Sequence, residues 1–207
     1  MPATMMHLLA ARRLWPSADD DFLWGSILPD CVDGDRALKD RLHFRDIDPK
    51  DRPAALLRFG KRLDLKKRFD LGVLFHFYLD YLWDRGPQQE HRNRFCGEEW
   101  FPAYRKELAA AGSRCAQRSP WNQEVWERLR HPNPAILQNS LGLPQKEIYE
   151  FLEFNARWHT EERLPESPEF TDALVDEFLE NAMASFRRYL KENFGEYGEQ
   201  FQCFGTR

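Results

Sequence analysis

Hydrophobic residues recur along most of the chain at the three- and four-residue spacing of an α-helix, and few segments alternate as β-strands do. The most apolar run covers residues 65–84. Large apolar residues form one stripe along it: Leu71, Phe75, Leu79 and Leu82. Such a stripe is typical of a buried helix. The pattern therefore predicts an all-α fold, a multi-helix bundle around this central helix, in one domain spanning residues 1–207.

The remaining helices are indicated by apolar spacing and by proline. A first helix is expected over residues 3–14, because Pro16 cannot continue it. Proline is favoured at the first position of a helix, and Ser119 and Ser167 each precede such a proline as predicted N-caps. Further helices are expected over 101–111, 120–130, 144–163 and 168–192. Residues 193–207 are expected to form an irregular tail.

Composition narrows the class of protein. Hydrophobic residues make up 42% and charged residues 31%, as in ordinary globular domains. A net charge of -4 provides no basic field over the molecule, which disfavours duplex nucleic acid as a partner. The apolar stretch near the N-terminus is too short for a secretory signal or a membrane span, so a cytoplasmic location is expected. The four cysteines are dispersed and predict neither a zinc ribbon nor a disulfide framework.

His76 and Asp80 are the first candidates for chemistry. They lie four residues apart on the predicted central helix, so both side chains project from one face and are close enough to bind the same ion. A buried histidine bonded to an aspartate one turn later is also a common structural pair. The spacing alone leaves both interpretations open.

Three more potential ligands stand where a side chain could point into the fold. His7 lies on the apolar first helix, Asp30 lies at a turn after Pro29, and His43 lies in a polar stretch. Three imidazoles and two carboxylates suit zinc, or else iron or manganese, better than calcium, which uses oxygen ligands alone. The set predicts one or two ions, with zinc as the first choice.

The order of these residues carries a family resemblance. After His7 come a G-x-I-x-P-D block ending at Asp30, a K-x-x-x-H-F block around His43, and a G-x-x-x-H-x-x-x-D helix with His76 and Asp80. Over roughly the first 85 residues these blocks resemble the zinc-dependent phospholipase C family, which is related to the fungal single-strand nucleases. The family is all-helical and hydrolyses phosphoesters at a cluster of zinc ions.

The resemblance implies a role for each residue. His7, Asp30, His43, His76 and Asp80 would be metal ligands. Asp30 and Asp80 would be the catalytic carboxylates, with Asp30 the first candidate to bridge two ions or act as a base. The substrate would be a small phosphoester or a phospholipid.

The cations around His43 have two interpretations. Lys39, Arg41 and Arg45 could bind an anionic ester, or they could form a solvated basic loop. Trp83 could likewise wall a substrate pocket, although an aromatic residue there more often belongs to the core.

A rival hypothesis is a binding or structural module in which metal only staples the first half of the chain. No H-x-x-x-E helix supplies a further metal site, and the remaining candidates are His91 and the pair His159 and Glu162. We expect His159 to lie on a helix surface and His131 in a loop. The sequence lacks the His-Asp dipeptide of HD-type phosphohydrolases and the E-x-x-H motif of ferritin-like di-iron bundles, which sets both classes aside.

Overall fold

The computed structural model describes residues 2–32, 36–95 and 99–195, and these residues form helices and connecting turns with no strand. The all-α prediction is confirmed. The elements are α1 (Thr4–Leu14), α2 (Asp20–Ile27), the 3-10 turn η1 (Leu28–Cys31), α3 (Arg36–Leu42), α4 (Arg52–Gly60), α5 (Arg68–Arg85), α6 (Pro87–Arg94), α7 (Trp100–Gln117), α8 (Asn122–Leu129), α9 (Pro134–Leu137), α10 (Gln145–Glu161) and α11 (Asp172–Phe194).

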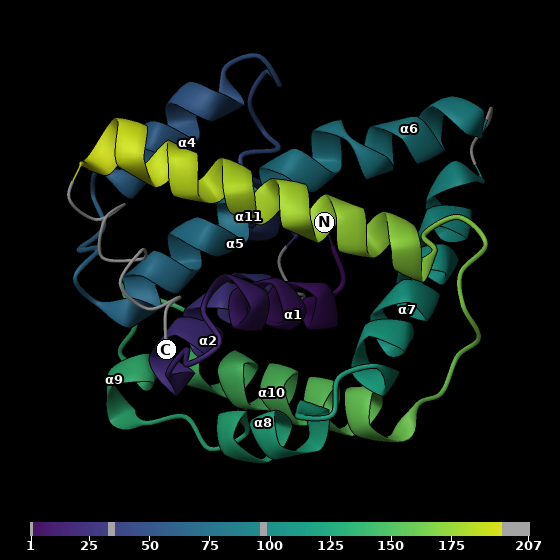
Figure 1. Ribbon diagram of the computed structural model, residues 1–207. Helices are drawn as coiled ribbons and strands as arrows, with labels where there is room; N and C mark the ends of the chain where they lie inside the picture. Colours follow the sequence, from purple (N-terminus) through teal and green to yellow (C-terminus); the bar gives the residue numbers. More distant parts are fainter. Residues whose placement is uncertain (1, 33–35, 96–98, 196–207) are drawn as a thin grey trace.

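The central helix is α5, as the apolar run predicts. It packs against α1, α2, α4, α6 and α11, and the long α11 crosses in front of it in Figure 1. Every residue of α5 from Phe69 to Asp80 is buried, so the helix has no solvent face over this stretch. The first helix, α1, is also buried for most of its length and contacts α2, α5, α7 and α11. Polar side chains on α1 and α5 are therefore enclosed by the core.

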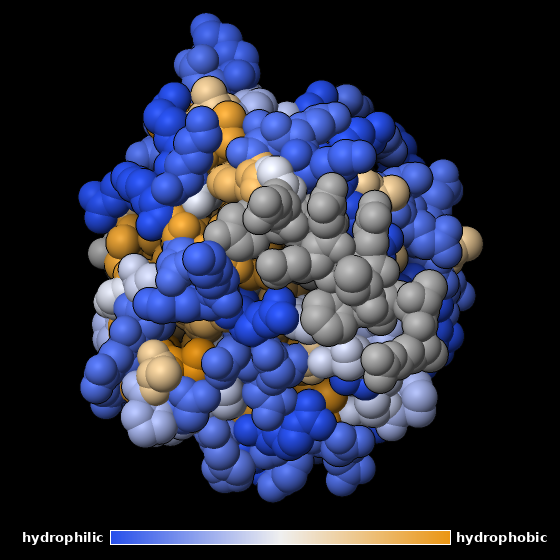
Figure 2. Space-filling model, turned by 60° about the vertical axis from the view of Figure 1, so that its left-hand side comes forward, coloured by the Kyte–Doolittle hydropathy of each residue, from blue (hydrophilic) through white to orange (hydrophobic). Residues whose placement is uncertain are grey.

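The other half of the chain encloses this centre. Helices α8 and α10 lie side by side along the bottom of Figure 1, and α7 closes the right-hand side. The face shown in Figure 2 is mostly hydrophilic, with hydrophobic residues visible in narrow areas between polar ones. No helix in the described part of the chain is both long and apolar enough to cross a membrane.

Several predicted helix starts are wrong. Thr171, and not Ser167, is the N-cap of α11, because its side chain accepts a hydrogen bond from the backbone N–H of Leu174. Ser167 instead accepts bonds from the backbone N–H groups of Glu169 and Phe170 in the preceding turn. Ser119 donates back to the carbonyl of Cys115 and caps no helix start. Helices α3, α4 and α6 were not predicted, since each has at most 9 residues and α6 is almost entirely polar.

The predicted tail falls mostly outside the described residues. Asn193 and Phe194 belong to the last turn of α11, which corrects the predicted start of the tail, and residues 196–207 are not described.

Cys115 is a buried thiol on α7, and burial raises its pKa to about 11. Cys96 and Cys203 lie outside the described residues.

Candidate metal centre

The structure brings all five predicted ligands together from four segments. His7 projects from α1, Asp30 from η1, and His43 from the residue after α3, while His76 and Asp80 lie one turn apart on α5. All five are buried, and the most exposed, Asp30, has only 6% of its surface accessible. Two groups of three side chains have ligand atoms close enough to hold an ion: His7, His76 and Asp80, and Asp30, His43 and His76.

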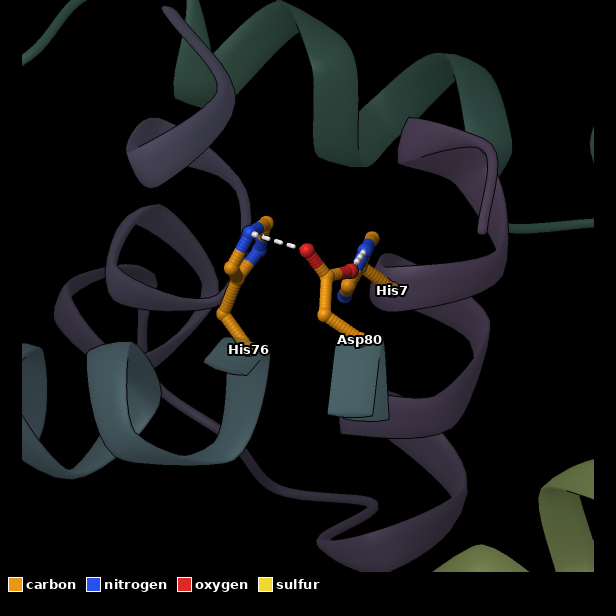
Figure 3. Close-up of side chains that lie close together, drawn as sticks. All are labelled: His7, His76 and Asp80. Carbon is orange, nitrogen blue, oxygen red and sulfur yellow. Dashed lines mark ion pairs between the residues drawn. The ribbon is translucent and has the colours of Figure 1, made fainter. Parts of the chain in front are cut away.

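Asp80 lies at the middle of the cluster. Its Oδ1 is 3.2 Å from Nε2 of His7, and its Oδ2 is 3.3 Å from Nε2 of His43 and 3.7 Å from Nε2 of His76. Figure 3 shows His76 and Asp80 pointing from α5 toward His7 on the facing helix. Neither carboxylate oxygen of Asp80 has hydrogen-bond geometry with these nitrogens. Buried carboxylate oxygens without a partner are costly, and a cation among the side chains would remove that cost.

Two imidazoles are held in the tautomer that binds metal through Nε2. His43 Nδ1 lies 2.8 Å from the carbonyl of Lys39, and His76 Nδ1 lies 2.9 Å from the carbonyl of Ser26. A carbonyl only accepts, so both Nδ1 atoms carry the proton. The two Nε2 atoms then present lone pairs to each other at 3.2 Å. Such a contact is repulsive unless a proton or a metal cation lies between them, and histidines whose Nδ1 is held by a carbonyl in this way are typical metal ligands.

Burial and neighbouring charges set the protonation states. Burial, aided by His7, lowers the pKa of His76 to about 3, so this imidazole is neutral near pH 7. Burial alone would raise the pKa of Asp30. The contact with His43 and the charges of His76 and Lys39 have the larger effect, so the pKa lies well below its ordinary value. The pKa of Asp80 is also lowered, because the surrounding imidazoles outweigh its burial. Neutral imidazole and ionised carboxylate are the forms that bind metal ions.

The backbone after α3 is strained where it delivers His43. Phe44 has a φ of 55°, in the left-handed region that favours glycine. The backbone N–H of Arg45 bonds to the carbonyl of Asp40, which closes the helix end. The Phe44 ring packs on Phe59 and Phe77 and thereby holds this conformation. Strained residues of this kind cluster at functional sites, and here the turn directs His43 inward.

The structure separates the three predicted substrate cations. Nζ of Lys39 lies 3.6 Å from Oδ1 of Asp30, whereas Arg45 lies 3.8 Å from Oδ2 of Asp80 and bonds to Asp84. Lys39 and Asp30 line one cavity, and Arg45 lines another. Arg41 is exposed and lines neither cavity. Lys39 and Arg45 therefore approach the cluster from different sides, and the binding of an ester by these cations stays a prediction.

The remaining histidines do not form a further metal site within the described residues. His91 is fully buried and stacks on Phe95. The prediction that His159 lies on the surface is wrong, since only 3% of it is exposed and its ring stacks on Trp126. His131 is exposed, as expected.

Trp83 belongs to the core. It is fully buried, and its indole N–H donates to the hydroxyl of Tyr104. It therefore does not wall a substrate pocket.

No protein-family model, curated protein or solved structure matches the chain. The resemblance to zinc-dependent phospholipase C stays a prediction, and the geometry of the cluster carries the functional argument.

Proposed function

We propose that the protein is a metal-dependent phosphoester hydrolase, with zinc as the first choice of metal and iron or manganese as alternatives. One observation carries the metal: the Nε2 atoms of His43 and His76 lie 3.2 Å apart while both Nδ1 protons are donated to backbone carbonyls. Mixed nitrogen and oxygen ligands suit these three metals. The family resemblance supports the choice of phosphoester chemistry.

The distances favour Asp80, and not Asp30, as the ligand shared between two ions. Nε2 of His76 has one lone pair and can bind only one ion. His76 belongs to both groups of three side chains and Asp80 to the first. Asp80 has one oxygen beside His7 and the other beside His43 and His76, so its carboxylate would reach ligands of both groups. Asp30 contacts the cluster through Oδ1, 3.4 Å from Nε2 of His43.

Asp30 is the ligand through which substrate would reach the cluster. Asp30 and Lys39 both line a cavity next to the site, and Asp30 is the most exposed of the five side chains. A bound metal would activate water and polarise a phosphoryl oxygen. The Asp30 carboxylate would orient the water or accept its proton, and the Lys39 ammonium would bind the anionic ester.

The test is hydrolysis of 4-nitrophenyl phosphate and bis(4-nitrophenyl) phosphate by zinc- or manganese-loaded protein. We expect slow turnover that a chelator abolishes and added metal restores. Asp30→Asn should lower the rate at least about a hundredfold, since removing one group that stabilises or activates at the reacting centre typically costs this much. Asp48→Asn, which changes an exposed carboxylate, should have no effect. Full metal occupancy without turnover of either ester would overturn the proposal.

The alternative is a structural metal site without catalysis. The near-complete burial of the ligands and their origin in four separate segments favour it, because an ion there would cross-link α1, η1, the end of α3 and α5. The same assay decides, since a structural site predicts bound metal, lowered stability on chelation and no turnover.

A further inference from the structure

A cavity of about 240 Å³ leads from the metal cluster to α10. We call it the α10 cavity. Asp30 and Lys39 line it at the cluster, Trp158 and His159 line it on α10, and the exposed Arg105 of α7 adds a second cation. A ligand in this space would therefore meet the carboxylate of Asp30, two cations and the side chains of α10.

The lining from α10 includes three aromatic side chains, Phe151, Phe154 and Trp158. Their spacing of three and four residues places them on one face of the helix. Phe154 is 58% exposed, although aromatic rings this large are usually covered. Flat rings of this kind bind planar ligand groups by stacking.

Two polar side chains of the α10 cavity have unused hydrogen-bonding capacity. Asn155 donates through Nδ2 to the carbonyl of Phe151, and its Oδ1 has no partner within the described part of the chain. His159 makes no side-chain hydrogen bond there either, and its Nδ1 is sealed from solvent. Nε2 is thus the ring nitrogen able to meet a ligand. Asn155 and His159 together offer an acceptor and an imidazole nitrogen, beside aromatic walls.

We propose that the α10 cavity binds the organic group of the phosphoester and that this group is planar, with polar atoms on its edge. The inference rests on the proposed hydrolase function. A hydrocarbon chain would cover Asn155 and His159 without bonding them, and buried polar groups left unpaired cost binding free energy. The cavity is smaller than the usual range for drug-sized ligands, roughly 300–1,000 Å³, which favours a group of about one ring.

The test compares the binding of three non-hydrolysable phosphonates to the metal-loaded protein by calorimetry. We expect 4-carbamoylphenylphosphonate to bind most tightly, phenylphosphonate next, and butylphosphonate most weakly. Phe154→Ala should weaken the binding of both aryl compounds about tenfold, because an aromatic contact is lost. Its exposure means that this change leaves the fold intact.

Two further variants test whether the effect is specific to the residues of the α10 cavity. Tyr149→Ala removes an exposed aromatic ring from the same helix, but one that does not line the α10 cavity, and it should change no affinity. Asn155→Leu should abolish the advantage of the carbamoyl compound over phenylphosphonate and leave phenylphosphonate binding unchanged.

Failure of this inference and failure of the proposed hydrolase function would give different results. Equal affinity for butyl- and phenylphosphonate, or unchanged binding in Phe154→Ala, would overturn the inference even if phosphoesters are hydrolysed. Faster hydrolysis of a short-chain phosphatidylcholine than of aryl phosphates would overturn it too. Selective aryl binding without any turnover would instead refute the hydrolase and leave the α10 cavity as a binding site.

Discussion

Gly25 and Gly72 lie back to back where α2 crosses α5. A Cβ on Gly25 would lie 3.0 Å from Cα of Gly72 and would overlap the carbonyl oxygen of Phe69. The contact determines part of the candidate metal centre, because Ser26 follows Gly25 and His76 lies one turn after Gly72. Close approach of the two helices allows Nδ1 of His76 to donate to the carbonyl of Ser26.

Gly72→Ala is therefore expected to disturb both the fold and the site. Its Cβ would overlap the carbonyl oxygen of Phe22, so the helices must separate. We expect a loss of about 1–3 kcal/mol in the free energy of unfolding, measured in urea, and a fall in bound metal. Gly60→Ala is the matched control, since its Cβ meets only side-chain atoms of Phe194 and Leu74, which can move. Full metal content in Gly72→Ala would show that the contact does not position His76.

The purified protein is expected to contain a transition metal. Oδ1 of Asp30 and both carboxylate oxygens of Asp80 are buried and accept no hydrogen bond within the described residues. A cation would stabilise them, and also the facing Nε2 atoms of His43 and His76. Elemental analysis after gel filtration should give one or two ions per chain, with zinc as the first choice. Protein that is free of metal and takes up none on dialysis against zinc would refute the site.

The five ligands should act as one unit. We expect His43→Ala and Asp80→Ala each to lower the metal content and, by roughly 5–10 °C, the Tm, since metal binding stabilises the folded state. His131→Ala is the matched control, because His131 is exposed and distant in sequence from the ligands. If metal content falls equally in all three variants, the cluster is not where the metal binds.

Stability should decrease as the pH falls below about 6.5, with a contribution from His159. Burial lowers its pKa to about 3 in the folded protein, whereas the unfolded chain takes up the proton near 6.5. Acid therefore favours the unfolded state, by about 2 kcal/mol between pH 8 and pH 5.

The measurement is urea unfolding of the wild type and His159→Leu at both pH values. The variant should lose about 2 kcal/mol less than the wild type over this interval. Parallel losses would mean that His159 is protonated in the folded protein.

The fold class follows from hydrophobic spacing in the long helices α10 and α11, which carry apolar stripes, and from the long apolar run of α5, which is buried on all sides over residues 69–80. The sequence does not predict α3 and α4, because these helices are short, with 7 and 9 residues. The spacing of His76 and Asp80 predicted their shared face. The prediction that His7, Asp30 and His43 lie together rests on the order of the motifs. Helical spacing could not supply it, because contacts between residues so far apart in sequence depend on tertiary packing.

The burial of His159 has a signal in the sequence. It continues the apolar positions Ile148, Leu152 and Ala156 of α10 at helical spacing, so its burial could have been predicted. The charged residues that follow His159 in the sequence instead suggest an exposed position. The different sides from which Lys39 and Arg45 approach the cluster were not predictable, since the left-handed Phe44 between His43 and Arg45 redirects the chain.

The two hydrogen bonds from His43 and His76 to backbone carbonyls would preorganise the proposed metal centre. Ordering a flexible side chain costs up to about 2 kcal/mol of conformational entropy. In this chain the two imidazoles are already ordered when the protein folds, so metal binding would order them little further. Small zinc modules differ, since they fold only around the ion. Loss of the metal should therefore leave the helices in place. The site would then select between metal ions by its rigid geometry. The ligands have little freedom to rearrange around an ion that prefers a different geometry.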